Sequence, residues 1–241
     1  MKKTIDLVCE MKIDKIINTI LKMSWFQNLF SKGSTDIRRN PILPANNQIN
    51  AWRKANRRMG WSISDREFDA AATLPPHSLT TEDRHQGFIG EVLFYGFGDD
   101  GSKGSDGVLS GKLAWEYAVK SRKGKTWQCE YIDFHKPEDI RIRPRAPVRP
   151  KGFYYGKILF GERSVNMAVS QLRKNLGTDT GCGPEGFQFL AITHPHCADL
   201  MTERKLPFMA LADYDVAPYG FNDFFDAPQM FCSNNILGLG I

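Results

Sequence analysis

The sequence lacks several features that would place it in a familiar class of protein. No apolar run approaches the roughly 18 residues needed to cross a bilayer. The five cysteines are an odd number, lie far apart and form no Cys-x-x-Cys pair, so they do not make a disulfide framework. Acidic residues at Asp6, Glu10 and Asp14 interrupt the apolar segment that a signal peptide requires. We therefore expect a cytoplasmic protein.

Fingerprints of common catalytic and phosphate-binding sites are also missing. The glycine-rich segments 98–107 and 177–186 match neither the P-loop nor the dinucleotide-binding pattern, which need a fixed glycine spacing at the start of a helix. No Gly-x-Ser-x-Gly nucleophile elbow occurs, and no internal repeat is visible. A functional site must therefore be inferred from the charge distribution and from local groups of polar residues.

Basic residues are scarce in the last part of the chain. After Leu176 only Arg204 and Lys205 are basic, against eight acidic residues, although the net charge of the whole chain is +5. The positive charge is concentrated in the first third and in the stretch between Lys112 and Lys151. This asymmetry favours a polyanionic partner on one part of the surface and a cation on another. Solvated charge on unrelated faces is the alternative.

The hydrophobic content of 41% is typical of a globular protein, and the apolar pattern predicts an α+β fold. We expect a mostly antiparallel mixed sheet with one packed helix, preceded by an N-terminal helical region. The predicted organisation is an amphipathic helix over 1–30, a linker over 31–46 and a single domain over 47–241. That domain is helical and basic at 47–86 and strand-rich at 87–241. The N-terminal helix is expected to pack on the domain or on a partner, with binding to a membrane surface as the alternative.

Local signals place the elements of the domain. A helix over 47–59 is predicted to end at Gly60, because glycine suits the position after a helix. Ser64 and Glu67 predict a capping box for a second, short helix. The clearest helix of the strand-rich part is predicted over 163–177. The predicted strands are 87–98, 113–121, 126–134, 139–143, 152–161, 186–194 and 206–216, with a hairpin joining the second and third.

Two polar pairs close two of the predicted buried strands. Asp213 and Asp215 are spaced by two, and such residues lie on the same face of a strand. Neighbouring carboxylates repel each other unless a cation lies between them, and Mg²⁺ or Mn²⁺ prefers carboxylate oxygen. His194 and His196 have the same spacing and are candidate ligands of that ion or of Zn²⁺. The sequence therefore predicts a metal site at these four residues, with a turn-capping aspartate and surface histidines as the alternatives.

Glu116 and Lys120 form a second candidate catalytic group. Divalent-metal nucleases combine carboxylates that hold the metal with a lysine that stabilises charge on the phosphate. On the predicted strand 113–121 both residues share one face, and Asp106 precedes them. The usual acid-x-Lys spacing would need an acid at Ala118, so cross-strand ion pairs on a solvent face are the alternative.

Two basic segments are candidates for contact with nucleic acid. The helix over 47–59 repeats basic residues at a spacing of four, which gives one broad cationic face. Segment 141–151 spaces its arginines with prolines on an extended chain that can follow a phosphate backbone. The candidate nucleic-acid-binding residues are Arg53, Arg57, Arg58, Arg141, Arg143 and Arg145.

These features together predict a divalent-metal-dependent hydrolase that acts on a phosphodiester, with a nuclease-like activity on nucleic acid. Asp213 and Asp215 would hold the metal, which would activate water and neutralise charge on the phosphate. The arginine-rich segments would bind the polyanion. The alternative is a non-catalytic nucleic-acid-binding or assembly protein of a phage or mobile element.

Overall fold

The computed structural model describes residues 42–74, 78–98, 106–130, 132–134, 136, 140–144, 146, 148–159, 169–176, 182–198, 209–217, 227–233 and 236–240. These residues all lie in one compact unit, Ile42–Ile241. The predicted N-terminal helix over 1–30 and most of the predicted linker lie outside the described residues.

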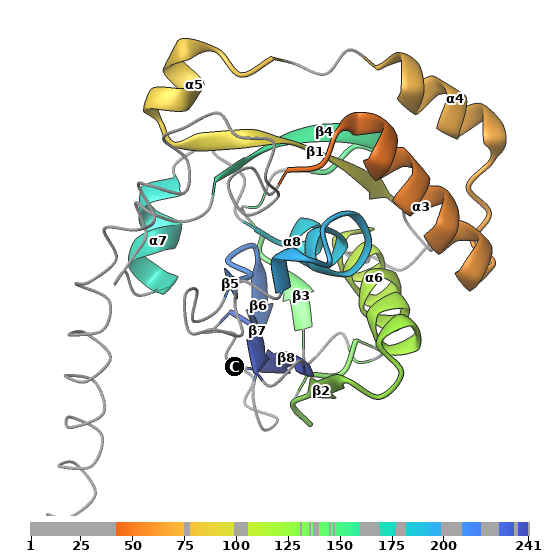
Figure 1. The fold of residues 1–241 in the computed structure, drawn as a ribbon. Coiled ribbons are helices and arrows are strands. Elements are labelled where there is room, and N and C mark those ends of the chain that lie inside the picture. The colour runs from red at the N-terminus through yellow and green to blue at the C-terminus, as the bar shows by residue number, and fades with distance from the viewer. Residues whose placement is uncertain are drawn as a thin grey trace, which may run out of the picture. The chain divides into compact units, whose positions relative to one another are not determined.

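Helices and mixed sheets make up the described part of the chain, which confirms the predicted α+β class. The elements in chain order (Figure 1) are α3 (Ala45–Met59), α4 (Asp65–Thr73), α5 (Thr81–His85), β1 (Phe88–Gly96), α6 (Asp106–Arg122), β2 (Thr126–Gln128), β3 (Ile140–Ile142), β4 (Gly152–Leu159), α7 (Val169–Leu176), α8 (Pro184–Gln188), the π-helical turn η2 (Phe189–Thr193), β5 (Met209–Ala210), β6 (Tyr214–Val216), β7 (Gln229–Ser233) and β8 (Ile236–Gly240). None of the described helices has the length and apolar character that crossing a bilayer requires.

The described strands form three sheets. β1 pairs antiparallel with β4 over their whole lengths, and β3 pairs antiparallel with β6. The third sheet has the order β2-β8-β7-β5, with β2 parallel to β8 and the other pairs antiparallel. The sheet structure is therefore mostly antiparallel and mixed, as the sequence predicts.

The sequence signals correctly predict where α3 ends and where α4 begins. α3 ends at Gly60, which adopts a left-handed conformation with φ of 71° and donates its N–H to Asn56 O. Ser64 and Glu67 form the predicted capping box at the start of α4. A second capping box, between Thr80 and Asp83, starts α5. Each box satisfies N–H groups that the first turn of a helix leaves without partners.

The predicted strand 113–121 is wrong, because this segment belongs to the 17-residue helix α6. Two glycines on one face of α6 let the helix approach β3 and β6 closely. A Cβ added at Gly111 would lie 2.1 Å from the Tyr214 hydroxyl oxygen, and one at Gly107 would lie 2.4 Å from the Ile142 side chain. Tyr214 also donates a hydrogen bond to Gly107 O at 2.7 Å. Close packing thus outweighs the strand preference of the aromatic residues in this segment.

The predicted strand 186–194 and the predicted hairpin are also wrong. Segment 186–194 folds as α8 and η2, and every one of its residues is buried. A segment that is apolar on all sides carries no periodicity that separates a helix from a strand. β2 does not return against 113–121 but pairs parallel with the C-terminal strand β8, with Thr126 opposite Leu237.

Among the described strands, β1 pairs with β4 alone, and two glutamine side chains satisfy part of its other edge. From α3, Gln48 accepts the Leu93 N–H at 2.7 Å and donates to Glu91 O at 3.1 Å. From α8, Gln188 accepts the Tyr95 N–H at 3.0 Å and donates to Tyr95 O at 2.7 Å. Each side-chain amide therefore makes the hydrogen bonds that a peptide group of a neighbouring strand would make.

Two further helix side chains complete this edge of β1. The Trp52 indole N–H of α3 donates to Leu93 O at 2.9 Å, and Ser110 of α6 accepts the Phe97 N–H at 3.1 Å. Trp52 is fully buried, and its ring lies 6.0 Å from the Tyr95 ring and 5.9 Å from the Phe153 ring. β1 is thus held by β4 on one side and by α3, α6 and α8 on the other.

Replacing Gln188 with methionine, which has a similar shape, tests this edge. The change leaves the N–H and C=O of Tyr95 buried without partners, and each such group costs about 1–3 kcal/mol. We expect the free energy of unfolding, measured by urea denaturation, to fall by about 2–4 kcal/mol. Gln86→Met is the control, because Gln86 is exposed and its amide donates only to Glu82. Similar losses in the two variants would contradict the role given to Gln188.

Candidate functional site

The two aspartates predicted to hold a metal are neutralised by arginines instead. Asp213 is fully buried, and its carboxylate oxygens lie 3.2 Å from Arg143 Nη2 and 2.7 Å from Arg149 Nη2. Asp215 is also buried, and its oxygens lie 3.0 Å from Arg173 Nη2 and 3.7 Å from Arg141 Nε. The cation that two neighbouring carboxylates require is therefore supplied by guanidinium groups.

The backbone explains how these charges meet. β3 pairs with β6 so that Arg141 lies opposite Asp215, and the Arg143 N–H donates to Asp213 O at 2.8 Å. Asp213 lies in the turn before β6, so the two aspartates do not share one strand, and the strand predicted to carry both is wrong here. Arg173 of α7 also donates to the carbonyls of Ala212 and Tyr214, which ties α7 to this turn.

Arg149 joins a third carboxylate to the network. Its guanidinium lies 2.9 Å from Glu185 Oε1, and the Tyr154 hydroxyl donates to the same oxygen at 2.8 Å. Burial raises the pKa of Tyr154, and the Glu185 carboxylate beside it raises that pKa further. We call Arg141, Arg143, Arg149, Arg173, Glu185, Asp213 and Asp215 the arginine–carboxylate network. Its four cations and three anions link β3, β6, α7, α8 and the segment before β4.

His194 is a buried structural residue rather than an open metal ligand. Its Nε2 accepts the backbone N–H of Leu43 at 2.9 Å, so Nδ1 carries the proton and donates to Thr193 Oγ1 at 2.8 Å. The ring stacks on Phe189 at 4.6 Å between centroids. Burial, together with the neighbouring His196, lowers the pKa of His194 to about 3. The imidazole thus stays neutral and holds the segment before α3.

The predicted four-residue metal set is not assembled. The His196 ring lies 5.7 Å from the His194 ring, and its Nε2 lies 3.6 Å from Cys197 Sγ. Within the described residues, no group of three or more His, Cys, Asp or Glu side chains is placed to hold a metal ion. A metal at Asp213 and Asp215 stays a prediction of the sequence.

The structure places the arginines predicted to bind nucleic acid in different surroundings. Arg141 and Arg143 belong to the arginine–carboxylate network, and Arg145 lies outside the described residues. Arg53 of α3 pairs with Asp65 and Asp69 of α4 at 3.0 and 3.1 Å, and its guanidinium also lies over the Phe68 ring. Three of the six arginines therefore form ion pairs within the protein.

Arg58 connects α3 to α6. Its Nη2 donates to Lys120 O at 2.7 Å, and Lys120 Nζ donates back to Arg58 O at 2.8 Å. This reciprocal contact brings together the C-terminal ends of the two helices, which are far apart in the sequence. The Arg58–Lys120 contact therefore joins two basic segments. We call their basic residues the basic patch: Lys54, Arg57, Arg58, Lys120, Arg122, Lys123 and Lys125.

The sequence does not predict that the basic residues between Lys120 and Lys125 belong to the same patch as those of α3. The pattern between Lys120 and Lys125 predicts a hairpin turn, which gives these charges no connection with those of α3. The sequence feature that could have linked the two segments is their lack of acidic residues. Neither 54–64 nor 117–128 contains an aspartate or glutamate. Only the contact between Arg58 and Lys120 shows that the two segments share a surface.

Glu116 and Lys120 line one hollow, although a helical spacing of four, rather than strand alternation, brings them together. The hollow has a volume of about 310 Å³ and lies against α6 and β2. The side chain of Asp106, at the start of the same helix, lies outside what the structure describes. We call this cavity the α6 hollow.

Removal of the Asp213 carboxylate tests the arginine–carboxylate network. Asp213→Ala leaves the guanidinium groups of Arg143 and Arg149 without their partner, and breaking a buried pair costs about 3–5 kcal/mol. We expect a loss of that size in the free energy of unfolding, measured by urea denaturation. Asp69→Ala, which removes a 76% exposed partner of Arg53, should change stability little. Equal losses in the two variants would contradict the assignment.

His194 predicts a pH dependence of stability. Above pH 6.5 the imidazole is neutral in both the folded and the unfolded protein, so it contributes no slope. Below pH 6.5 the unfolded chain takes up a proton that the folded chain, with its pKa of about 3, does not. The free energy of unfolding should therefore fall by about 2 kcal/mol between pH 6.5 and 5. This slope should vanish in His194→Gln and persist in His85→Gln, at an exposed histidine.

Comparisons with known proteins give this chain no relative. No protein-family model matches it, and no curated protein or solved structure matches it significantly.

Proposed function

We propose that the protein binds nucleic acid through the basic patch. The observation that carries this proposal is the charge of the two joined helix ends, which together hold seven basic residues and no acid. Five of the seven residues are exposed, and Arg58 and Arg122 are half-buried. Lysine and arginine on such a surface neutralise phosphates and release their counterions, which is the main source of sequence-independent affinity for nucleic acid.

The position of the patch explains why the fold tolerates it. Arg57 and Arg58 lie in the last turn of α3, and Lys120 and Arg122 lie in the last turn of α6. The C-terminal end of a helix carries a partial negative charge, which offsets part of the repulsion between these cations. No ion pair between the patch and an acidic residue occurs within the part of the chain that the structure describes, so its charge is available to a polyanion.

An exposed aromatic residue lies at the edge of the same segment. Trp127 of β2, two residues after Lys125, is 50% exposed. Aromatic side chains beside a cationic surface stack on the bases of single strands, and each stacked base contributes about 1–3 kcal/mol. Trp127 therefore supports a nucleic acid, rather than a smaller anion, as the partner of the patch.

Hydrolysis of a bound phosphodiester with Mg²⁺ or Mn²⁺ is a second candidate. Its support is the position of Glu116 and Lys120, which line the α6 hollow together with Asp133. Two carboxylates can hold a divalent ion with the help of substrate phosphate oxygens, and the lysine would stabilise the charge that develops. Asp213 and Asp215 are less accessible for this role, because they lie inside the arginine–carboxylate network.

The test is the salt dependence of binding to a labelled single-stranded oligonucleotide, measured by fluorescence anisotropy. Arg57→Ala combined with Lys123→Ala should weaken binding and reduce the slope of log affinity against log salt. The slope should fall by about 0.7 for each phosphate that is no longer neutralised, and so by about 1.4 for the pair.

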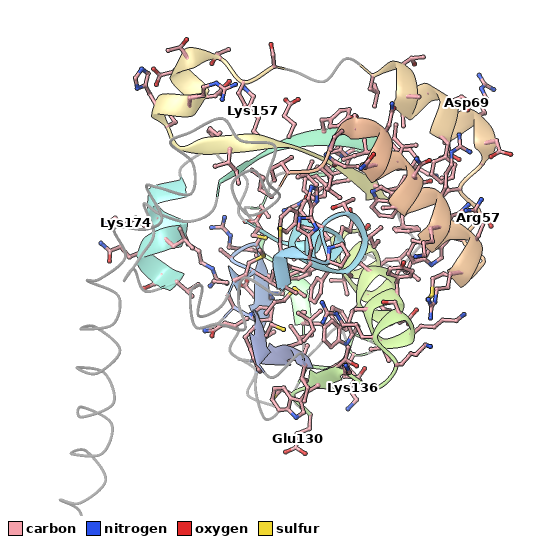
Figure 2. The ribbon with its side chains drawn as sticks, in the orientation of Figure 1. Arg57, Asp69, Glu130, Lys136, Lys157 and Lys174 are labelled. Carbon is pink, nitrogen blue, oxygen red and sulfur yellow. The ribbon has the colours of Figure 1, made fainter. Side chains whose placement is uncertain are left out.

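The control removes the same charge elsewhere. Arg66→Ala combined with Lys174→Ala alters exposed residues of α4 and α7, and Lys174 projects on the opposite side of the view from Arg57 (Figure 2). Equal effects of the two double variants, or no binding at low salt, would refute the basic patch as the binding surface. Shortening of the oligonucleotide when Mg²⁺ or Mn²⁺ is added would make the second candidate the function.

A further inference from the structure

The α6 hollow adjoins the basic patch and combines charged and apolar walls. Its volume of about 310 Å³ reaches the lower end of the range for small-molecule sites, roughly 300 Å³. Lys120 belongs to both surfaces, because it lines the hollow and also bonds to the end of α3. The lining residues are Lys112, Trp115, Glu116, Val119, Lys120, Gln128, Asp133 and Phe134.

One stripe of α6 supplies three of the four charged residues of the hollow, and Asp133 is the fourth. Lys112, Glu116 and Lys120 are spaced by four, so they lie one above another on the same face of the helix. Glu116 could pair with either lysine at this spacing. It makes no hydrogen bond or ion pair with any residue that the structure describes, and Lys120 donates to Arg58 O instead. The hollow therefore presents an available carboxylate between two ammonium groups.

The apolar part of the hollow is held in place. The Trp115 indole N–H donates to the side chain of Gln128, whose own amide donates to Ile132 O. Val119, one helical turn after Trp115, is 45% exposed although it is apolar. A fixed aromatic wall and an exposed aliphatic side chain fit a flat, partly apolar ligand.

We propose that the α6 hollow receives an unpaired guanine from a strand bound on the basic patch. This inference rests on the proposed function and adds the substrate class, a single strand with a preferred base. Guanine carries two adjacent donors, N1–H and the N2 amino group, which a carboxylate such as that of Glu116 can accept together. Lys120 would hold a flanking phosphate, and Trp115 and Val119 would lie against the ring.

The chemistry separates guanine from the other bases. Thymine offers a single N–H donor, and cytosine and adenine each offer one amino group beside ring nitrogens that accept, which a carboxylate would repel. In a duplex the donors of guanine are occupied by cytosine, so a paired base cannot present them to Glu116. A base inserted in this way must come from a single strand or be flipped out of the stack.

The test compares short thymidine oligonucleotides that carry one central guanine, adenine, cytosine or thymine, in the presence of EDTA. A bidentate contact to a base discriminates by about 1–3 kcal/mol, so we expect the guanine strand to bind about tenfold more tightly than the thymine strand. Glu116→Gln should remove this preference and leave the salt slope unchanged, because Glu116 neutralises no phosphate.

Glu130→Gln is the matched control, since it removes the same charge from an exposed residue that does not line the hollow. Glu130 projects at the lower edge of the view in Figure 2. It should keep the guanine preference. Binding that is equal for the four bases, a preference that survives in Glu116→Gln, or equal affinity for the same sequence as a duplex would each overturn the inference while leaving the basic patch intact. Loss of all binding would instead overturn the proposed function.

Discussion

The unpaired edge of β1 is the constraint on which the rest of this structure depends. A buried backbone N–H or C=O without a partner costs about as much as a lost hydrogen bond. Within the described ranges, β1 has a strand on one side only. Gln48 and Trp52 of α3, Ser110 of α6 and Gln188 of α8 provide the missing partners. Each of these side chains must lie within hydrogen-bond distance of a particular backbone group at this edge. The edge of β1 therefore determines where α3, α6 and α8 lie.

The arginine–carboxylate network has a similar role in the second half of the fold. The paired strands β3 and β6 are only three residues long and provide little backbone bonding. Ion pairs from Arg143, Arg149 and Arg173 to Asp213 and Asp215 join them to α7 and to the segment before β4. Asp213 and Asp215, which the sequence predicts as metal ligands, thus pair with guanidinium groups at a junction between these elements.

The proposed binding surface follows from these constraints. With α3 and α6 both placed by β1, their C-terminal ends meet, and the contact between Arg58 and Lys120 joins two basic segments. The same stretch of α6 carries Glu116 toward the hollow beside the patch. The basic patch and the α6 hollow thus lie next to each other because one helix contributes to both.

The sequence by itself determined the elements whose signals are local. Gly60 ends α3, Ser64 and Glu67 start α4, and β1, β3 and β4 form where apolar and β-branched residues predict them. The tertiary structure decided the segments 113–121 and 186–194. Close packing at Gly107 and Gly111 keeps the first in α6, and the second is buried on all sides, so its residues satisfy both the helical and the strand pattern. It also decided which arginines pair with Asp213 and that the two basic segments meet. Contacts between residues far apart in the chain produce no periodic pattern in the sequence. Of the candidate site, therefore, the residue types of Glu116, Lys120 and Arg57 could be recognised in advance, but only folding determined which of them share a surface.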